Sequence, residues 1–152
     1  MIARRARSTL PVLVVAEPPA LYLSRPPLVV DCSVLSAVLF EEATRDEALA
    51  RLAGKALHAP SLIEYEVASV ALKKLAHGWP ADAVHSALEG FDSHALELHR
   101  CHLPAMVDLA RHHRLSAYDA AYLWLAAQLK APLATFDAQL GKAAQRHLGA
   151  LE

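Results

Sequence analysis

Short apolar segments alternate with longer helical segments along most of the chain, and this alternation strongly limits the possible folds. Four segments have the length and composition of strands: residues 28–31, 55–59, 95–98 and 132–136. Strands that are separated by helices of ten or more residues usually pair in parallel, with helices covering both faces of the sheet. The sequence therefore predicts an α/β domain with a central, mostly parallel, short-stranded sheet flanked by helices.

The predicted helices lie around these strands, over residues 34–42, 45–53, 60–76, 80–91, 104–113, 116–130 and 137–148. Ser33 is the expected cap of the first helix. Ser61 and Glu64 have the spacing of a capping box, as have Ser116 and Asp119. Asp137 is placed to begin the last helix.

Composition limits the chain to one domain with a substantial core. Of its 152 residues, 55% are hydrophobic and 20% are charged, which excludes intrinsic disorder. A net charge of −1 gives no general attraction for nucleic acid, so such binding requires a local patch. The glycines form no phosphate-binding loop, and no apolar run is long enough to span a bilayer. We expect a cytoplasmic protein without a membrane segment, in which both cysteines are reduced.

The amino-terminal 27 residues differ from the rest of the chain. They are basic and contain proline, with a short apolar run over residues 10–16. A basic segment before an apolar run has the outline of a secretory signal, but Pro11 and Glu17 bound the run and a Pro-Pro pair follows. An edge strand or a loose arm is the preferred interpretation. We expect an arm over residues 1–27 and a domain over residues 28–152.

Carboxylates occupy positions where parallel sheets place their ligand sites. Asp31 ends the first predicted strand, Asp137 follows the last one, and Asp119 stands in the first turn of a helix. Glu66 is the acid of an otherwise apolar segment, residues 65–72. Ligands of open parallel sheets bind at the carboxyl ends of the strands, so we expect Asp31 and Asp137 at the same edge.

Each of these acids also has an ordinary structural explanation. Asp119 and Asp137 can cap helices, and Glu66 can reach water from a half-exposed face. Taken together, however, clustered like charges repel and require a compensating cation. Oxygen ligands without histidine or cysteine suit Mg²⁺ or Mn²⁺.

Four segments carry a resemblance to a known family: VVDCSVL around Asp31, APSLIEYEVAS around Glu66, LSAYDAAYLWLA around Asp119 and LATFDAQL around Asp137. Over residues 28–148 the chain resembles PIN domains, and in particular the VapC-like ribonuclease toxins of type II toxin–antitoxin pairs. It departs from the family pattern in Ser69, where asparagine is frequent, and in its long amino-terminal arm.

The resemblance implies a PIN-like three-layer fold and a metal-dependent endoribonuclease that acts as a toxin. It implies that Asp31, Asp119 and Asp137 hold Mg²⁺ or Mn²⁺ and that Glu66 completes the catalytic set. Ser33 and Thr135 would supply hydroxyls that orient these ligands or water. The implied partners are an RNA substrate, a small VapB-like antitoxin and a second copy of the chain in a homodimer.

Two further choices concern individual residues. Glu64 competes with Glu66 for the second acidic position, and we choose Glu66 because Glu64 already has a role in the predicted capping box.

Candidates for RNA contact are Lys73 and Lys74 after Glu66, and Arg111 and Arg114 in a basic cluster that includes two histidines. A solvated helix end explains that cluster equally well. The spacing of His99, Cys101 and His102 matches no common zinc site.

Two other function classes remain open. A phosphotransfer or phosphatase domain also uses acids on a parallel sheet, but it usually needs a lysine after a late strand, and none follows residues 133–135. A catalytically silent PIN-fold binding module is the other alternative. The presence of all four acids argues against it.

Overall fold

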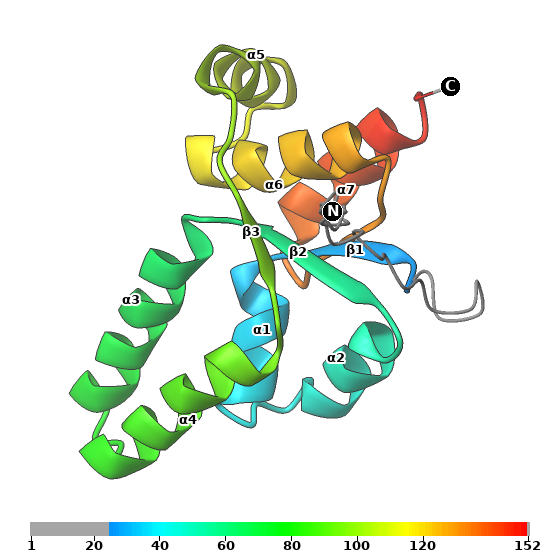
Figure 1. Cartoon of the computed structure of the whole chain (residues 1–152). Helices are drawn as coiled ribbons and strands as arrows, with labels where there is room; N and C mark the ends of the chain where they lie inside the picture. Colours follow the sequence, from blue (N-terminus) through cyan, green and yellow to red (C-terminus); the bar gives the residue numbers. More distant parts are fainter. Residues whose placement is uncertain (1–24, 152) are drawn as a thin grey trace, which may run out of the picture.

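A parallel sheet of four strands forms the centre of the protein (Figure 1). The computed structural model describes residues 25–151. The strands are β1 (Pro27–Val30), β2 (Ala56–Pro60), β3 (Glu97–His99) and β4 (Leu133–Ala134), in the order β3-β2-β1-β4. All three strand pairs are parallel, and this confirms the α/β fold class predicted from the sequence.

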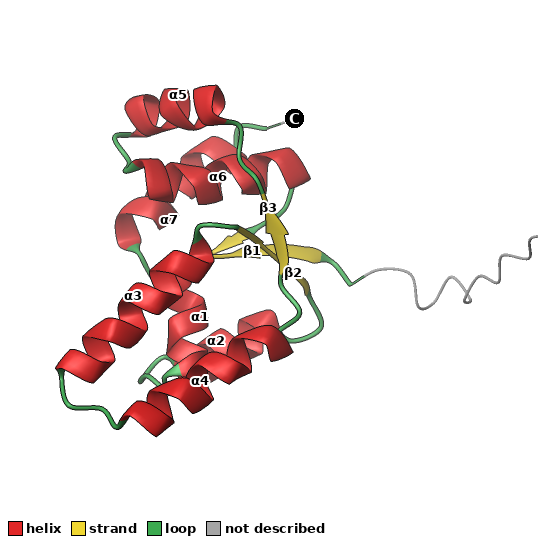
Figure 2. Ribbon diagram, turned by 60° about the vertical axis from the view of Figure 1, so that its left-hand side comes forward, coloured by secondary structure: helices red, strands yellow, loops and turns green. Residues whose placement is uncertain are grey.

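Helices cover both faces of the sheet, as Figures 1 and 2 show. They are α1 (Cys32–Leu39), α2 (Arg45–Leu52), α3 (Ile63–Ala76), α4 (Ala81–Ser93), α5 (Leu103–His113), α6 (Ala117–Leu129) and α7 (Ala138–Leu148). The first four lie towards one side, while α6 and α7 cover the other and α5 packs on α6.

Alternation along β1 divides the core between the two faces. Leu28 and Val30 pack with residues of α1 and α2, whereas Val29 belongs to the larger cluster that includes Leu123 of α6. The strand is buried on both faces because helices cover both, which explains its continuous apolar sequence.

The helices α3 and α4 form a hairpin that projects from the sheet (Figure 2). Within α3 only Ile63, Val67 and Ala71 are buried, and within α4 only Val84 is. The hairpin therefore presents most of its surface to solvent, including apolar side chains of α3.

Two predicted helix caps are wrong. Asp31, not Ser33, caps α1 and accepts a hydrogen bond from the Val34 backbone, and the helix begins two residues earlier than expected. Ser61 makes no capping bond to α3, because its hydroxyl donates instead to the backbone carbonyl of His99 at 3.2 Å. Pro60 lies at the end of β2 and not in the first helical turn.

The two other predicted helix caps are confirmed. The Ser116 hydroxyl caps α6 by accepting from the Asp119 backbone, and Asp137 caps α7 by accepting from Leu140. Among the described residues, no helix is both long and apolar enough to cross a membrane. Most of the predicted amino-terminal arm, residues 1–24, lies outside the described residues.

Candidate active site

Asp31 lies at the point where β1 ends and α1 begins. Its residue is only 5% exposed, and its Oδ1 accepts hydrogen bonds from the Ser33 hydroxyl at 2.6 Å and from the Val34 backbone at 3.2 Å. A buried carboxylate requires such partners, because burial removes the hydration that stabilises its charge. The carboxylate is therefore fixed at the carboxyl edge of the sheet.

Thr135 binds the other oxygen of this carboxylate. The register pairs Val30 with Ala134, so the residues that follow, Asp31 and Thr135, meet at the same edge. The Thr135 hydroxyl donates to Asp31 Oδ2 at 2.5 Å and accepts from the backbone of Asp137 at 2.9 Å. This pair of bonds links Asp31 to the segment that carries Asp137, as the sequence predicted for the two aspartates.

Ser33 provides a second connection between these segments. While its hydroxyl donates to Asp31, the same oxygen accepts from the Phe136 backbone at 2.9 Å. The two hydroxyl residues singled out in the sequence therefore lie between the loops after β1 and β4 and hold them together.

Glu66 reaches the site from α3 and is held by a residue that the sequence analysis missed. The hydroxyl of Tyr122 on α6 donates to Glu66 Oε1 at 2.6 Å. Tyr122 is fully buried, whereas Glu66 is half-buried and Glu64 is exposed. A tyrosine in the otherwise apolar segment 120–126 was the available signal, since a buried hydroxyl needs a partner.

The acids influence one another's protonation. Burial raises the pKa of Asp31, although hydrogen bonds from Ser33 and Thr135 oppose this. The pKa of Glu66 is raised by burial and by the negative charges of Asp31 and Asp119, while the bond from Tyr122 lowers it. Burial and the charge of Asp137 raise the pKa of Asp119. These charges link Glu66 to Asp31 and Asp119, and Asp119 to Asp137, although no three of the four acids offer oxygens that all lie within 4.8 Å of one another.

Within residues 25–151 no basic side chain forms an ion pair with any of these four acids. A divalent cation fits such a set, because it neutralises the negative charges that, together with burial, raise the pKa values of Glu66 and Asp119. Their oxygens are hard ligands of the kind that Mg²⁺ prefers, and Mg²⁺ keeps several water molecules where protein oxygens do not reach. Asp31, Asp119 and Asp137 are the candidate ligands.

A cavity lies beside Glu66. It is lined by residues of α1, α3 and α6 and by the residue just before α3: Cys32, Leu62, Tyr65, Glu66, Ser69, Val70, Lys73 and Tyr118. Lys73 therefore shares a cavity with a predicted catalytic acid. Lys74 instead donates to Glu42 at 3.0 Å, with its ammonium over the ring of Trp79.

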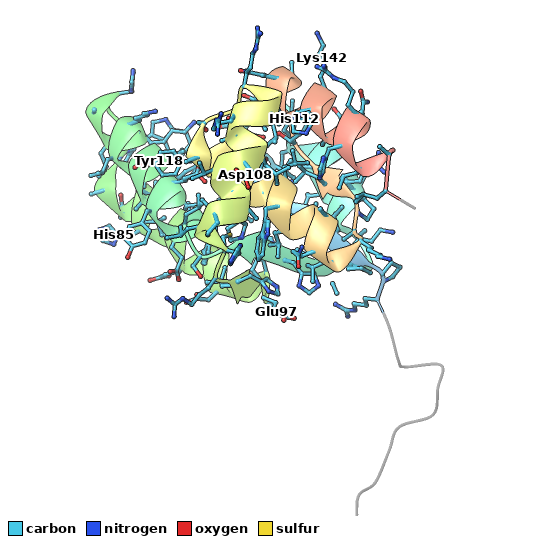
Figure 3. The ribbon with its side chains drawn as sticks, turned by 90° about the horizontal axis from the view of Figure 1, so that it is seen from above. His85, Glu97, Asp108, His112, Tyr118 and Lys142 are labelled. Atoms are coloured by element: carbon cyan, nitrogen blue, oxygen red, sulfur yellow. The ribbon has the colours of Figure 1, made fainter. Side chains whose placement is uncertain are left out.

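A second, basic cavity lies between the end of α5 and the length of α7. Arg114, Lys142 and Arg146 line it together with three histidines, and Figure 3 shows His112 and Lys142 at this end of the molecule. The fold thus places Arg114 beside Lys142 and Arg146, which are distant from it in the sequence. Arg111 is exposed in the last turn of α5 and does not line the cavity.

Comparison with known proteins identifies the family of the chain. The sequence model of the PIN domain matches residues 28–145, which contain all four acids. The crystal structure of PAE2754 from Pyrobaculum aerophilum has a similar fold, with a TM-score of 0.63 and 22% sequence identity over 78% of this chain and 86% of that one. None of the curated proteins matches the sequence significantly. Since the family match covers most of the chain and includes the acidic site, the chain belongs to the PIN domain family.

Proposed function

We propose that this protein is a Mg²⁺- or Mn²⁺-dependent endoribonuclease. PIN domains are generally metal-dependent nucleases. The observation that supports this function best is the group of four acids around buried Asp31, which has no basic partner within residues 25–151. Such a group is costly to fold unless a cation joins it.

In this proposal the protein's own residues position the metal, the phosphodiester and water. Asp31, Asp119 and Asp137 bind the ion, and Glu66 completes the charged set, held by Tyr122. When bound, the metal would lower the pKa of a water molecule and stabilise charge on the phosphate oxygens. Ser33 and Thr135 hold the carboxylate of Asp31 in place while it binds the ion.

Basic residues at the two cavities are the proposed RNA contacts. Lys73 shares the cavity with Glu66, and Arg114 joins Lys142 and Arg146 at the second cavity. Because the chain is close to neutral as a whole, such local groups must supply the attraction for phosphates. Lys74 and Arg111 stay candidates from the sequence, although Lys74 is engaged with Glu42.

We also propose that the nuclease is the toxin of a toxin–antitoxin pair and acts on cytoplasmic RNA. Tyr65 and Leu72 are 77% and 67% exposed on α3, the helix that carries Glu66. An antitoxin segment that covers this apolar surface and inserts an arginine or lysine among the acids would block the site by charge-assisted pairing. Expression of the chain alone should slow growth, and an adjacent small antitoxin should restore it.

A homodimer is the proposed assembly. No residue of α5 is buried, and Leu103 and Val107 are exposed one helical turn apart. This makes the outer face of α5 the candidate interface. Light scattering should give the mass of two chains, and Leu103→Glu should shift it towards one.

Cleavage of labelled RNA by the purified protein tests the proposed activity. Metal-free protein in a chelator should be inactive, and addition of Mg²⁺ or Mn²⁺ should start internal cleavage. Cleavage that is unaffected by chelator would contradict the proposal. Binding of RNA without cleavage under any divalent ion would favour the silent binding module.

A further inference from the structure

A second group of metal-ligating side chains lies outside the acidic site. His58 on β2 and Glu97 and His99 on β3 bring two imidazoles and a carboxylate together. The distance from His58 Nδ1 to His99 Nε2 is 3.0 Å, and the Glu97 oxygens lie 3.6 Å and 3.7 Å from these two nitrogens. Within residues 25–151 no other three His, Cys, Asp or Glu side chains offer ligand atoms that all lie within 4.8 Å of one another.

The backbone explains why these three side chains meet. The register pairs His58 with Glu97 across the two strands, and His99 lies two residues beyond Glu97. Side chains two residues apart point to the same face of a strand, so all three share one face of the sheet. Figure 3 shows Glu97 well away from Tyr118, which lies beside the acidic site.

We propose that His58, Glu97 and His99 bind a borderline divalent transition ion, with Zn²⁺ as the preferred metal. Zinc bonds of about 2.1 Å in a tetrahedron separate neighbouring ligand atoms by about 3.4 Å. The two nitrogens are 3.0 Å apart, and they lie 3.6 Å and 3.7 Å from different oxygens of Glu97, separations close to this value. Three ligands of these types leave a fourth position for water.

The donor set distinguishes this site from the acidic one. Imidazole nitrogens suit zinc, cobalt and nickel, whereas Mg²⁺ prefers oxygen alone. Binding replaces the hydrogen bond between His58 and His99, and the donating ring carries its proton on its other nitrogen instead, so that both rings offer a lone pair to the ion. The half-buried rings fix the two nitrogens, while the side chain of Glu97, which is 67% exposed, leaves an entry path for the ion.

The position of the site gives the metal a structural role. The strand β3 lies at the edge of the sheet and has three residues, two of them ligands. The carbonyl of His99 also accepts from the backbone and the hydroxyl of Ser61, just before α3. A bound ion therefore joins β3 to β2 and strengthens the attachment of the segment that leads to Glu66. Its binding should stabilise the folded state by linkage.

A second histidine pair is the natural competitor for a transition ion. His113 Nε2 and His147 Nδ1 are 3.2 Å apart. Arg114, Lys142 and Arg146 line the same cavity, and their positive charges disfavour a cation there. The carboxylate of Glu97 attracts a cation to the first group, whereas the basic residues repel a cation from the second. We therefore place the transition ion at the first group.

Metal titration of the full chain, freed of any histidine tag, tests the proposal. Calorimetry with ZnSO₄ measures affinity and stoichiometry, and visible absorption with Co²⁺ reports the coordination geometry. The test variants are Glu97→Gln, at an exposed side chain, and His99→Gln. The matched controls are His147→Gln, at the competing pair, and His85→Gln, at an exposed position on α4 that Figure 3 labels.

The wild-type protein and both controls should bind one Zn²⁺ per chain, with a rise in Tm and the strong absorption of tetrahedral Co²⁺. Both test variants should bind at least about tenfold more weakly, the loss seen even for outer partners of metal ligands. Excess Mg²⁺ should not displace the zinc. Unchanged affinity in folded Glu97→Gln and His99→Gln, loss of binding in His147→Gln instead, or an absence of zinc binding by the wild-type protein would overturn the proposal.

Discussion

The hydroxyl of Thr135 donates a 2.5 Å hydrogen bond to Asp31 across a sequence separation of 104 residues. The same hydroxyl accepts from the backbone of Asp137. One side chain therefore fixes the distance between two candidate metal ligands from different strand ends. The geometry of the site depends on this threonine as well as on the acids.

Replacement of Thr135 tests this role. Thr135→Val removes both bonds and leaves an oxygen of Asp31 without its donor, so metal affinity and cleavage should fall by about 10- to 100-fold. Thr135→Ser keeps the hydroxyl and should retain most activity. Titration of Mg²⁺ against the cleavage rate measures both effects. Equal activity in the valine and serine variants would show that the hydroxyl is dispensable.

Glu66→Gln and Glu64→Gln form a matched pair. In the Glu66→Gln variant the amide oxygen can still accept from Tyr122, while the charge that repels Asp31 and Asp119 is lost. Metal-free stability should therefore be equal or higher, and cleavage should be strongly reduced. Exposed Glu64 should tolerate the change with near wild-type activity. The reverse ranking in a cleavage assay would exchange the two assignments.

Tyr122→Phe should destabilise the protein without creating a large cavity. It removes a hydrogen bond to a carboxylate, which is worth about 1.5–3 kcal/mol when buried, and half-buried Glu66 should show the lower end of that range. Urea unfolding measures the loss. In the background of Glu66→Gln the same substitution should cost less, because the bond no longer involves a charge. An equal cost in both backgrounds would contradict an ionised Glu66 as the partner.

Stability should depend on pH in a direction set by the acids. Folding raises the pKa values of Asp31, Glu66 and Asp119, so the folded state keeps their protons to higher pH than the unfolded state. Their contribution to the free energy of unfolding is therefore greatest at low pH and decreases as pH rises above about 4.

Metal binding should reverse that trend, because it favours the ionised acids. The rise in Tm caused by Mn²⁺ should be larger at neutral pH than in mild acid. Thermal melts with and without Mn²⁺ across this pH range measure it. A rise in Tm that is the same at every pH would argue against binding at these acids.

The sequence predicted the sheet, the helices and the position of Asp31 and Asp137, because these follow from local patterns and from the geometry of parallel strands. Its errors concern polar side chains with more than one possible partner. Serine is a common helix-capping residue, and Ser33 and Ser61 both precede helices. Ser33 nevertheless donates to Asp31, and Ser61 donates to the carbonyl of His99. The competing acceptor of Ser61 comes from another strand through the tertiary structure, whereas that of Ser33 is a neighbour two residues earlier in the chain.

Contacts between segments that are distant in the sequence could not be predicted from it either. Tyr122 and Glu66 are 56 residues apart, and His58 and His99 are 41 residues apart. Both pairings depend on how the helices and strands pack and on strand register, which no local motif encodes. In the sequence His99 stands beside Cys101 and His102, whereas in the structure its ring lies beside His58.

We propose that the acids around Asp31 hold the metal that RNA cleavage requires. The decisive measurement is metal-dependent cleavage by Asp31→Asn, beside wild-type protein and Glu64→Gln as the charge-matched control. The folded Asp31→Asn variant should lose nearly all cleavage in Mg²⁺ and in Mn²⁺, while Glu64→Gln should keep it. Cleavage at the wild-type rate by folded Asp31→Asn would show that this carboxylate does not hold the metal.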